Sequence, residues 1–186
     1  MNIGFAMCGS FCTFAEVFPV MEEVAKAHNV YPIFSFVSAN TDSRFGTAAG
    51  FLERAEQICG RPVIRTIAEA EPIGPKKLLD LLIIAPCTGN TLAKLSRSIA
   101  DTPVTMAAKS HLRNGRPVLV AVSTNDGLAG AAENIGRLLA RKHYYFVPYG
   151  QDNPEKKPTS LVAHFDKIPE AAALALTGQQ IQPLLI

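Results

Sequence analysis

An apolar run that ends abruptly at a proline constrains this chain more than any other segment of its sequence. Residues 81–85 are all apolar, and Pro86 follows them directly. A continuous apolar run is typical of a strand buried on both faces of a parallel sheet, and a proline marks its end because proline cannot donate to a ladder. A short polar loop that includes residues 88–90, Thr-Gly-Asn, follows, and a helical pattern begins at Thr91; a helix start leaves backbone N–H groups free for an anion. The segment therefore predicts a buried strand, a helix and a phosphate-bearing ligand where the two meet.

The same alternation of strand and helix runs through the whole chain of 186 residues. Apolar and β-branched runs predict strands at 2–7, 30–37, 62–66, 81–85, 117–122 and 144–147. Helical spacing and caps predict helices at 13–28, 47–58, 91–99, 103–114 and 169–176, a short one after 75, and one from Asn125 or Asp126 to 141. We expect a single α/β domain, a Rossmann-like doubly wound sheet of about six mainly parallel strands with helices on both faces. A polar excursion at 148–158 and an apolar tail at 183–186 are its irregular parts.

Composition argues against several classes of function. A net charge of +2, 8% aromatic residues and no tryptophan give no basis for nucleic-acid binding. The first residues lack a basic signal-peptide region and no apolar run is long enough to span a bilayer, so we expect a cytoplasmic protein without membrane contact. The four cysteines and four histidines show no ligand spacing, so no metal site is expected.

Four polar loops are expected to meet at one edge of the sheet, at 8–12, 38–46, 86–91 and 123–127. Ligands of doubly wound sheets bind beyond the carboxyl ends of the strands. The first loop holds only one of the three glycines of a dinucleotide fingerprint, and the chain lacks a Gly-Lys-Ser or Gly-Lys-Thr motif, so the loops favour a mononucleotide. The alternative is that their hydroxyls only cap helices and turns. The predicted cofactor-binding residues are Gly9, Ser10, Ser38, Pro86, Thr88, Gly89, Asn90 and Thr91.

Two of these loops resemble the flavoprotein family of flavin-containing cysteine decarboxylases. The matching segments are Cys8-Gly9-Ser10 and 85–91, and the family places a Gly-Ser loop and a Pro-Ala-Ser-Ala-Asn-Thr loop at FMN. A closer resemblance, to the family of dipicolinate synthase B subunits, covers almost the whole chain and rests on the segments 41–46, 69–76, 123–127 and 149–158. Residues 87–89, Cys-Thr-Gly, replace the decarboxylases' Ala-Ser-Ala, and 123–127 replaces their substrate clamp, so cysteine decarboxylation is not expected.

The closer resemblance implies an oxidoreductase component that oxidises a dihydrodipicolinate to dipicolinate, pyridine-2,6-dicarboxylate, in sporulation. It also implies FMN as the cofactor, and a partner, the dipicolinate synthase A subunit, that carries a nicotinamide-type dinucleotide, NAD(P). A small dicarboxylate needs cations and hydrogen-bond donors, and the predicted substrate-binding residues are Arg44, Asn125 and Lys157. For Arg44 the alternative is a solvated loop arginine, and for 148–158 the alternatives are a flap over the site and a surface linker. No catalytic residue is singled out.

Two other functions remain open at this point. One is a non-catalytic scaffold that stabilises the A subunit, and the other is an FMN-dependent decarboxylase or prenyltransferase relative. The apolar tail at 183–186 predicts a homo-oligomer, because an apolar terminus usually needs a surface to cover it. The alternative for the tail is that it packs on its own domain.

Overall fold

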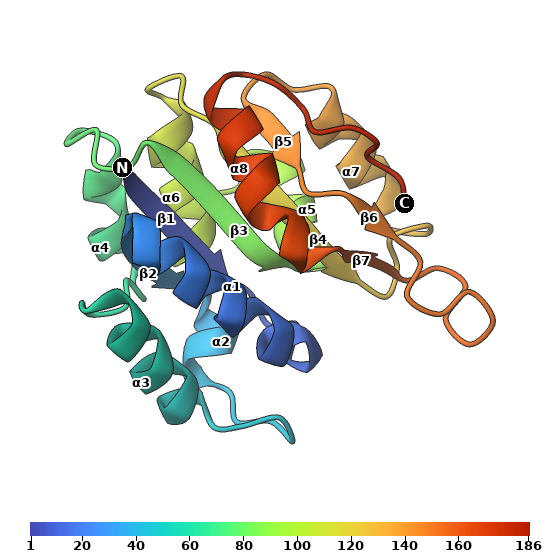
Figure 1. Cartoon of the computed structure of the whole chain (residues 1–186), viewed down its shortest axis with the longest axis horizontal. Helices are drawn as coiled ribbons and strands as arrows, with labels where there is room; N and C mark the ends of the chain where they lie inside the picture. Colours follow the sequence, from blue (N-terminus) through green and yellow to red (C-terminus); the bar gives the residue numbers. More distant parts are fainter.

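Five parallel strands form the centre of the computed structural model, which describes residues 1–186 (Figure 1). In spatial order they are β2 (Asn29–Phe34), β1 (Asn2–Met7), β3 (Leu81–Cys87), β4 (Val118–Thr124) and β5 (Tyr144–Phe146). Two short strands, β6 (Tyr149–Gly150) and β7 (Leu161–Ala163), form an antiparallel hairpin, and β7 also pairs antiparallel with the carboxyl end of β4. The seven-stranded, mainly parallel sheet confirms the predicted Rossmann-like α/β class.

Helices cover both faces of this sheet, as the strand–helix alternation predicts. Figure 1 shows α1 and α8 over one face and α5, α6 and α7 over the other. The helices are α1 (Phe14–Ala27), α2 (Phe36–Asn40), α3 (Ala48–Cys59), α4 (Ile67–Ala70), α5 (Gly89–Ser96), α6 (Pro103–Leu112), α7 (Ala132–Leu139) and α8 (Ile168–Leu176), with 3₁₀ turns at Phe11–Thr13, Glu71–Ile73 and Phe165–Lys167. None of these helices combines the length and the apolar character that crossing a membrane requires.

The apolar run that predicts a doubly covered strand is the centre of the core. Every residue of β3, from Leu81 to Cys87, is buried. The strand lies between β1 and β4, and helices pack on both of its faces, so no position along it reaches water. Burial on both faces explains why the run has no polar alternation.

The order of the strands places a crevice at the carboxyl end of the sheet. β1 pairs with β2 on one side and with β3 on the other, so the chain leaves β1 and β3 in opposite directions. Ligands of open α/β sheets bind at such a reversal of strand order. The loops that follow β1 and β3 are the predicted ligand loops, and they flank this crevice.

Four local predictions need correction. The second strand ends at Phe34 instead of 37, because the Ser35 hydroxyl accepts a hydrogen bond from the Ser38 N–H at 3.2 Å and caps α2. The predicted strand at 62–66 is reduced to one bridge between Ile33 and Ile64. The predicted short helix after 75 is absent, and α4 with its 3₁₀ turn precedes that point, started by a capping box at Thr66. The predicted helix from Asn125 or Asp126 begins only at Ala132, since turns occupy 125–131.

The excursion and the tail lie side by side at the β6 edge of the sheet. The excursion, residues 148–158, contains β6 and most of the loop that connects β6 to β7. The Tyr149 N–H donates to the Leu184 carbonyl at 3.0 Å, so the tail packs on its own domain, which is the alternative left open for it. Leu185 and Ile186 nevertheless remain 70% and 50% exposed, so part of the apolar tail is still uncovered.

Candidate functional site

A cavity of about 560 Å³ opens at the carboxyl edge of the sheet, and we call it the main cavity. Its walls come from the loop after β1, the start of α1, the loop around 44–45, the loops after β3 and β4, and the β6–β7 hairpin. These segments lie far apart in the sequence and meet here because parallel strands end at one edge. The main cavity brings together six of the predicted site residues, Gly9, Ser10, Arg44, Thr88, Asn125 and Lys157.

A second cavity, of about 350 Å³, adjoins the first, and we call it the helix-start cavity because the first turns of α2 and α5 line it. Gly9 and Thr88 belong to both cavities. Asn90 and Thr91, at the start of α5, line the helix-start cavity. Together the two adjoining cavities contain eight of the eleven predicted site residues.

Three predicted residues lie outside the cavity walls. Ser38 is fully buried, and its hydroxyl donates to the Met7 carbonyl at 2.8 Å, so it joins α2 to the end of β1. Pro86 is buried within β3. Gly89 is in contact with the loop after β4, and a Cβ built there would lie 2.7 Å from Thr124 Oγ1 and from Asp126 Oδ1. Ser38 and Pro86 shape the loops from behind the cavity surface, and Gly89 lets the first turn of α5 lie close to Thr124 and Asp126.

Backbone N–H groups without an acceptor gather around the shared residues of the two cavities. The amides of Gly9, Phe11 and Cys12 donate to no carbonyl or side chain, and neither do those of Gly89 and Asn90 in the first turn of α5. Free amides at a helix start carry partial positive charge and bind anions. The donor set therefore suits a phosphate.

Hydroxyl groups tie the three loops together beneath this surface. Ser10 Oγ lies 2.8 Å from Ser123 Oγ, which joins the loop after β1 to the end of β4. The Thr91 hydroxyl donates to Cys8 Sγ at 3.3 Å, which joins α5 to the end of β1. Burial raises the pKa of the Cys8 thiol to about 11, so Cys8 remains a neutral acceptor at pH 7 and does not act as a nucleophile.

The Gly9 position requires a residue without a side chain. A Cβ built at Gly9 would lie 2.7 Å from Cγ1 of Val37, a stiff β-branched side chain at the start of α2. Its absence lets the loop after β1 pass close to α2, and it leaves the Gly9 amide open to the helix-start cavity.

Two cations line the main cavity, and they differ in how they are held. Arg44 is exposed, lies over the Phe45 ring at 4.8 Å and forms no ion pair. Lys157 donates to Asp152 Oδ2 at 2.9 Å, and this contact raises the pKa of the ammonium group. Burial acts to raise the pKa of Asp152, but hydrogen bonds from Lys157 and Ser160 outweigh it and hold that pKa below its usual value. The site therefore contains one free cation and one paired cation.

Several residues that line the main cavity are not among the predicted site residues, notably Glu16, Phe45, Ser123 and Asp152. Ser123 and Asp152 fall inside segments that carry the family resemblance, so a local signal exists for them. Glu16 has no such signal, because one acidic residue in the first turn of a helix is a common capping feature. Only the antiparallel pairing of β7 with β4 brings Asp152 and Lys157 to this edge.

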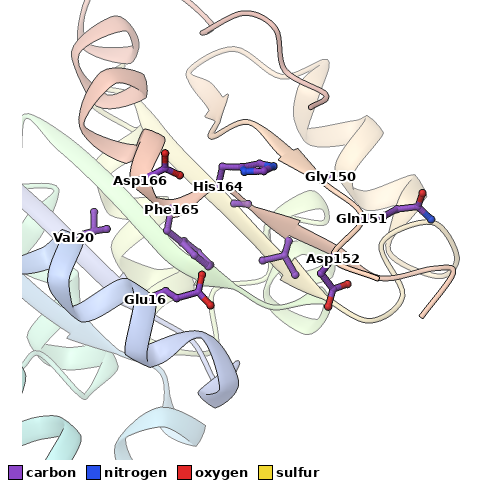
Figure 2. A pocket seen from close by; sticks show the side chains of 10 residues that line it. Glu16, Val20, Gly150, Gln151, Asp152, His164, Phe165 and Asp166 are labelled. Atoms are coloured by element: carbon purple, nitrogen blue, oxygen red, sulfur yellow. The ribbon is translucent and has the colours of Figure 1, made fainter. Parts of the chain in front are cut away.

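Figure 2 shows a third cavity, of about 460 Å³, which we call the hairpin cavity because β6 and β7 form one wall. It shares Glu16, Asp152 and Val162 with the main cavity. Glu16 and Asp152 therefore lie at the boundary between the main cavity and the hairpin cavity. His164 and Asp166 lie on the far side of that boundary.

Comparisons with known proteins agree with this architecture. The flavoprotein family model matches residues 2–149. The dipicolinate synthase B subunit of Bacillus subtilis is 45% identical over 186 residues, which are 100% of this chain and 93% of that protein. The crystal structure of the dipicolinate synthase B subunit from Bacillus halodurans superposes with a TM-score of 0.91 at 45% identity, covering 100% of this chain and 95% of the other.

A more distant structure shares the fold alone. DmrB of Burkholderia xenovorans, solved in complex with FMN and described as a cubic protein cage for redox transfer, has a TM-score of 0.69 at 17% identity. The match covers 95% of each chain. The family model and the full-length relatives together decide the identification: the chain belongs to the flavoprotein family and is a homologue of the dipicolinate synthase B subunit.

Proposed function

We propose that this chain is the B subunit of a dipicolinate synthase, an oxidoreductase component that contributes, together with the A subunit, to the oxidation of dihydrodipicolinate to dipicolinate. The observation that carries the proposal is the meeting of Gly9, Ser10 and Thr88 with Arg44 and Lys157 in one cavity. Phosphate-binding groups and carboxylate-binding groups thus share the site. The 45% identity to the Bacillus subtilis protein over the full chain supports the same function.

The cofactor of this proposal is FMN, and the residues present fit it. The free amides of Gly9, Gly89 and Asn90 suit the phosphate, and the hydroxyls of Ser10 and Thr88 line the cavity beside them. Thr91 supports Thr88, to whose hydroxyl its backbone N–H donates at 3.4 Å, while Ser38 and Pro86 fix the loops from inside. When bound, FMN supplies a two-electron acceptor.

The substrate of this proposal is a small dicarboxylate held between two loops. Arg44 binds one carboxylate, because a guanidinium group without a partner can make two parallel hydrogen bonds to it. Lys157, on the hairpin, meets the second carboxylate and shares its charge with Asp152. Asn125 adds an amide at the same edge, and its loop is anchored by the Thr159 hydroxyl, which donates to the Asn125 carbonyl at 2.7 Å.

The proposal extends to the assembly and its setting. The A subunit would supply NAD(P) to accept the electrons, and the exposed tail residues Leu185 and Ile186 support a homo-oligomer. The four cysteines form no disulfide, which supports a cytoplasmic location.

An FMN titration tests the cofactor site. The Ser10→Ala/Thr88→Ala double variant should bind FMN about a hundredfold or more weakly than the wild type, since each of the two lost hydrogen bonds to a charged group contributes roughly 1.5–3 kcal/mol. Thr177→Ala, beyond the far end of α8, is the matched control and should bind FMN like the wild type. Equal affinity of all three proteins would reject the assignment of the phosphate to these hydroxyls.

A coupled assay tests the substrate site. Dipicolinate formation is measured with the A subunit and the wild type, Arg44→Ala or Lys157→Ala, and the neighbouring Lys156→Ala is the matched control. Loss of the bidentate Arg44 contact should lower kcat/KM about tenfold or more, while Lys156→Ala should leave it unchanged. Full activity of both Arg44→Ala and Lys157→Ala would place the dicarboxylate in the A subunit and favour a scaffold role for this chain.

A further inference from the structure

Glu16 occupies an unusual position for an acidic side chain. It lies in the first turn of α1 and lines both the main cavity and the hairpin cavity (Figure 2). Its carboxylate is exposed and takes part in no hydrogen bond or ion pair. Asp152, the other acid at this boundary, is held by Lys157 at 2.9 Å. Glu16 is therefore the one carboxylate of the main cavity that is free to accept a proton.

The other titratable groups of the main cavity are poor candidates for accepting a proton. The main cavity contains no histidine, and His164 lies in the hairpin cavity beyond the boundary. The Asp152 contact raises the pKa of Lys157, so that amine stays protonated. The titratable and charged groups around Glu16 are, on the main-cavity side, Cys12, Arg44 and Lys157, and, on the hairpin side, Asp152, His164 and Asp166.

The proposed reaction needs a base. Oxidation of a dihydropyridine dicarboxylate to the pyridine removes two hydrogens from the ring. One C–H bond breaks with its electron pair, and that hydride reduces a two-electron acceptor of the flavin class. The second hydrogen leaves as a proton, and the electrons of its bond complete the aromatic ring. A positioned carboxylate that accepts the proton accelerates such a step by about 10²–10⁴-fold.

We propose that Glu16 is the general base that takes this proton from the substrate in the main cavity. The inference rests on the proposed function and assigns a catalytic residue to it. Arg44 and Lys157 hold the two carboxylates of the substrate, and their positive charges offset the repulsion between the dianion and Glu16. The protonated Glu16 side chain then releases its proton to water, because it is exposed.

The experiment compares Glu16→Gln with the wild type by two measurements, both on the full chain. Calorimetry measures the binding of dipicolinate to the FMN-loaded protein, and steady-state kinetics with the A subunit give kcat/KM for dipicolinate formation. Glu23→Gln, about two turns further along the same helix and in the wall of a separate cavity, is the matched control.

If Glu16 is the base, Glu16→Gln binds dipicolinate at least as tightly as the wild type, because a repulsive charge is gone. Its kcat/KM falls about a hundredfold or more. Glu23→Gln keeps the wild-type kcat/KM and dipicolinate affinity.

Three results would overturn the assignment. Undiminished kcat/KM of Glu16→Gln rules out Glu16 as the base and leaves the proposed function intact. Weaker dipicolinate binding together with lower activity makes Glu16 a binding residue instead. If the wild type neither binds dipicolinate nor supports its formation, the proposed function itself fails, and the role of Glu16 fails with it.

Discussion

A buried histidine makes the stability of this protein depend on pH in a defined window. His111, on α6, is 1% exposed, and its Nε2 donates to the Pro117 carbonyl at 2.9 Å while Nδ1 has no partner. Burial lowers its pKa from 6.5 to about 4, and the nearby Arg116 cation acts in the same direction. The folded protein therefore holds this imidazole neutral under conditions in which the unfolded chain protonates it.

The free energy of unfolding falls with falling pH, because the unfolded chain binds a proton at His111 at a higher pH than the folded protein does. Above pH 6.5 neither state is protonated at His111, and the full stability is present. As the pH falls from 6.5 toward 4, the unfolded chain binds a proton at His111 that the folded protein does not bind, so the free energy of unfolding declines. At about 1.4 kcal/mol per pH unit, this interval corresponds to about 3 kcal/mol, a large share of the stability of an ordinary domain.

Urea unfolding at about pH 7 and about pH 4 measures this loss. The wild type should lose about 3 kcal/mol more between the two pH values than His111→Gln, which keeps a donor for the Pro117 carbonyl but cannot titrate. His28→Gln, at the end of α1, controls for the removal of one imidazole and should lose as much as the wild type. An equal loss in the wild type and His111→Gln would refute the reasoning.

Three further predictions concern the loops, a helix cap and the tail. Gly89→Ala should lower the free energy of unfolding by about 1–3 kcal/mol, because the added Cβ would contact Thr124 and Asp126. Gly136→Ala, in open space on α7, should raise the free energy of unfolding by about 0.5–1 kcal/mol. Urea unfolding that gives changes of the same sign for both variants would contradict this reasoning. Thr102→Ala should cost about 1 kcal/mol in the same assay, because the Thr102 hydroxyl accepts from the Thr105 N–H at 3.1 Å at the start of α6, and Thr102→Ser should restore the loss. Truncation after Gln182 removes the exposed Leu185 and should reduce the number of chains per particle, as measured by light scattering. An unchanged number of chains per particle would rule out the tail as the contact between copies of the chain.

Local patterns in the sequence were sufficient for the centre of the fold. The apolar run 81–85 predicts a buried strand, and β3 is buried throughout. The predicted boundaries of the first strand, 2–7, are those of β1. Thr102 and Pro103 predict the start of α6, which begins at Pro103 with Thr102 as its cap. These features depend on side-chain burial and on capping over a few residues, so a short window of sequence contains the information.

Segments in which a local preference competes with a tertiary contact were predicted less well. Residues 35–37 look like the continuation of a strand, but the Ser35 cap and the bond from Ser38 to Met7 turn them into α2. Pro62 to Thr66 has the composition of a strand, yet only Ile64 finds a partner, beside β2 at the edge of the sheet. Neither outcome can be read from a short window, because the deciding partner lies elsewhere in the chain.

The site, too, has features that local sequence predicts and features that depend on contacts between distant segments. Local patterns predict that Gly9, Ser10 and 88–91 follow buried strands, since strand ends and helix starts are local features. The folded chain is needed to see that Arg44 and Lys157 share a cavity, that Lys157 is paired with Asp152, and that Glu16 lies unpaired between two cavities. The physical reason is distance along the chain: β7, which begins at Leu161, pairs with the end of β4 at Thr124, and that long-range pairing carries the hairpin to the mouth of the crevice.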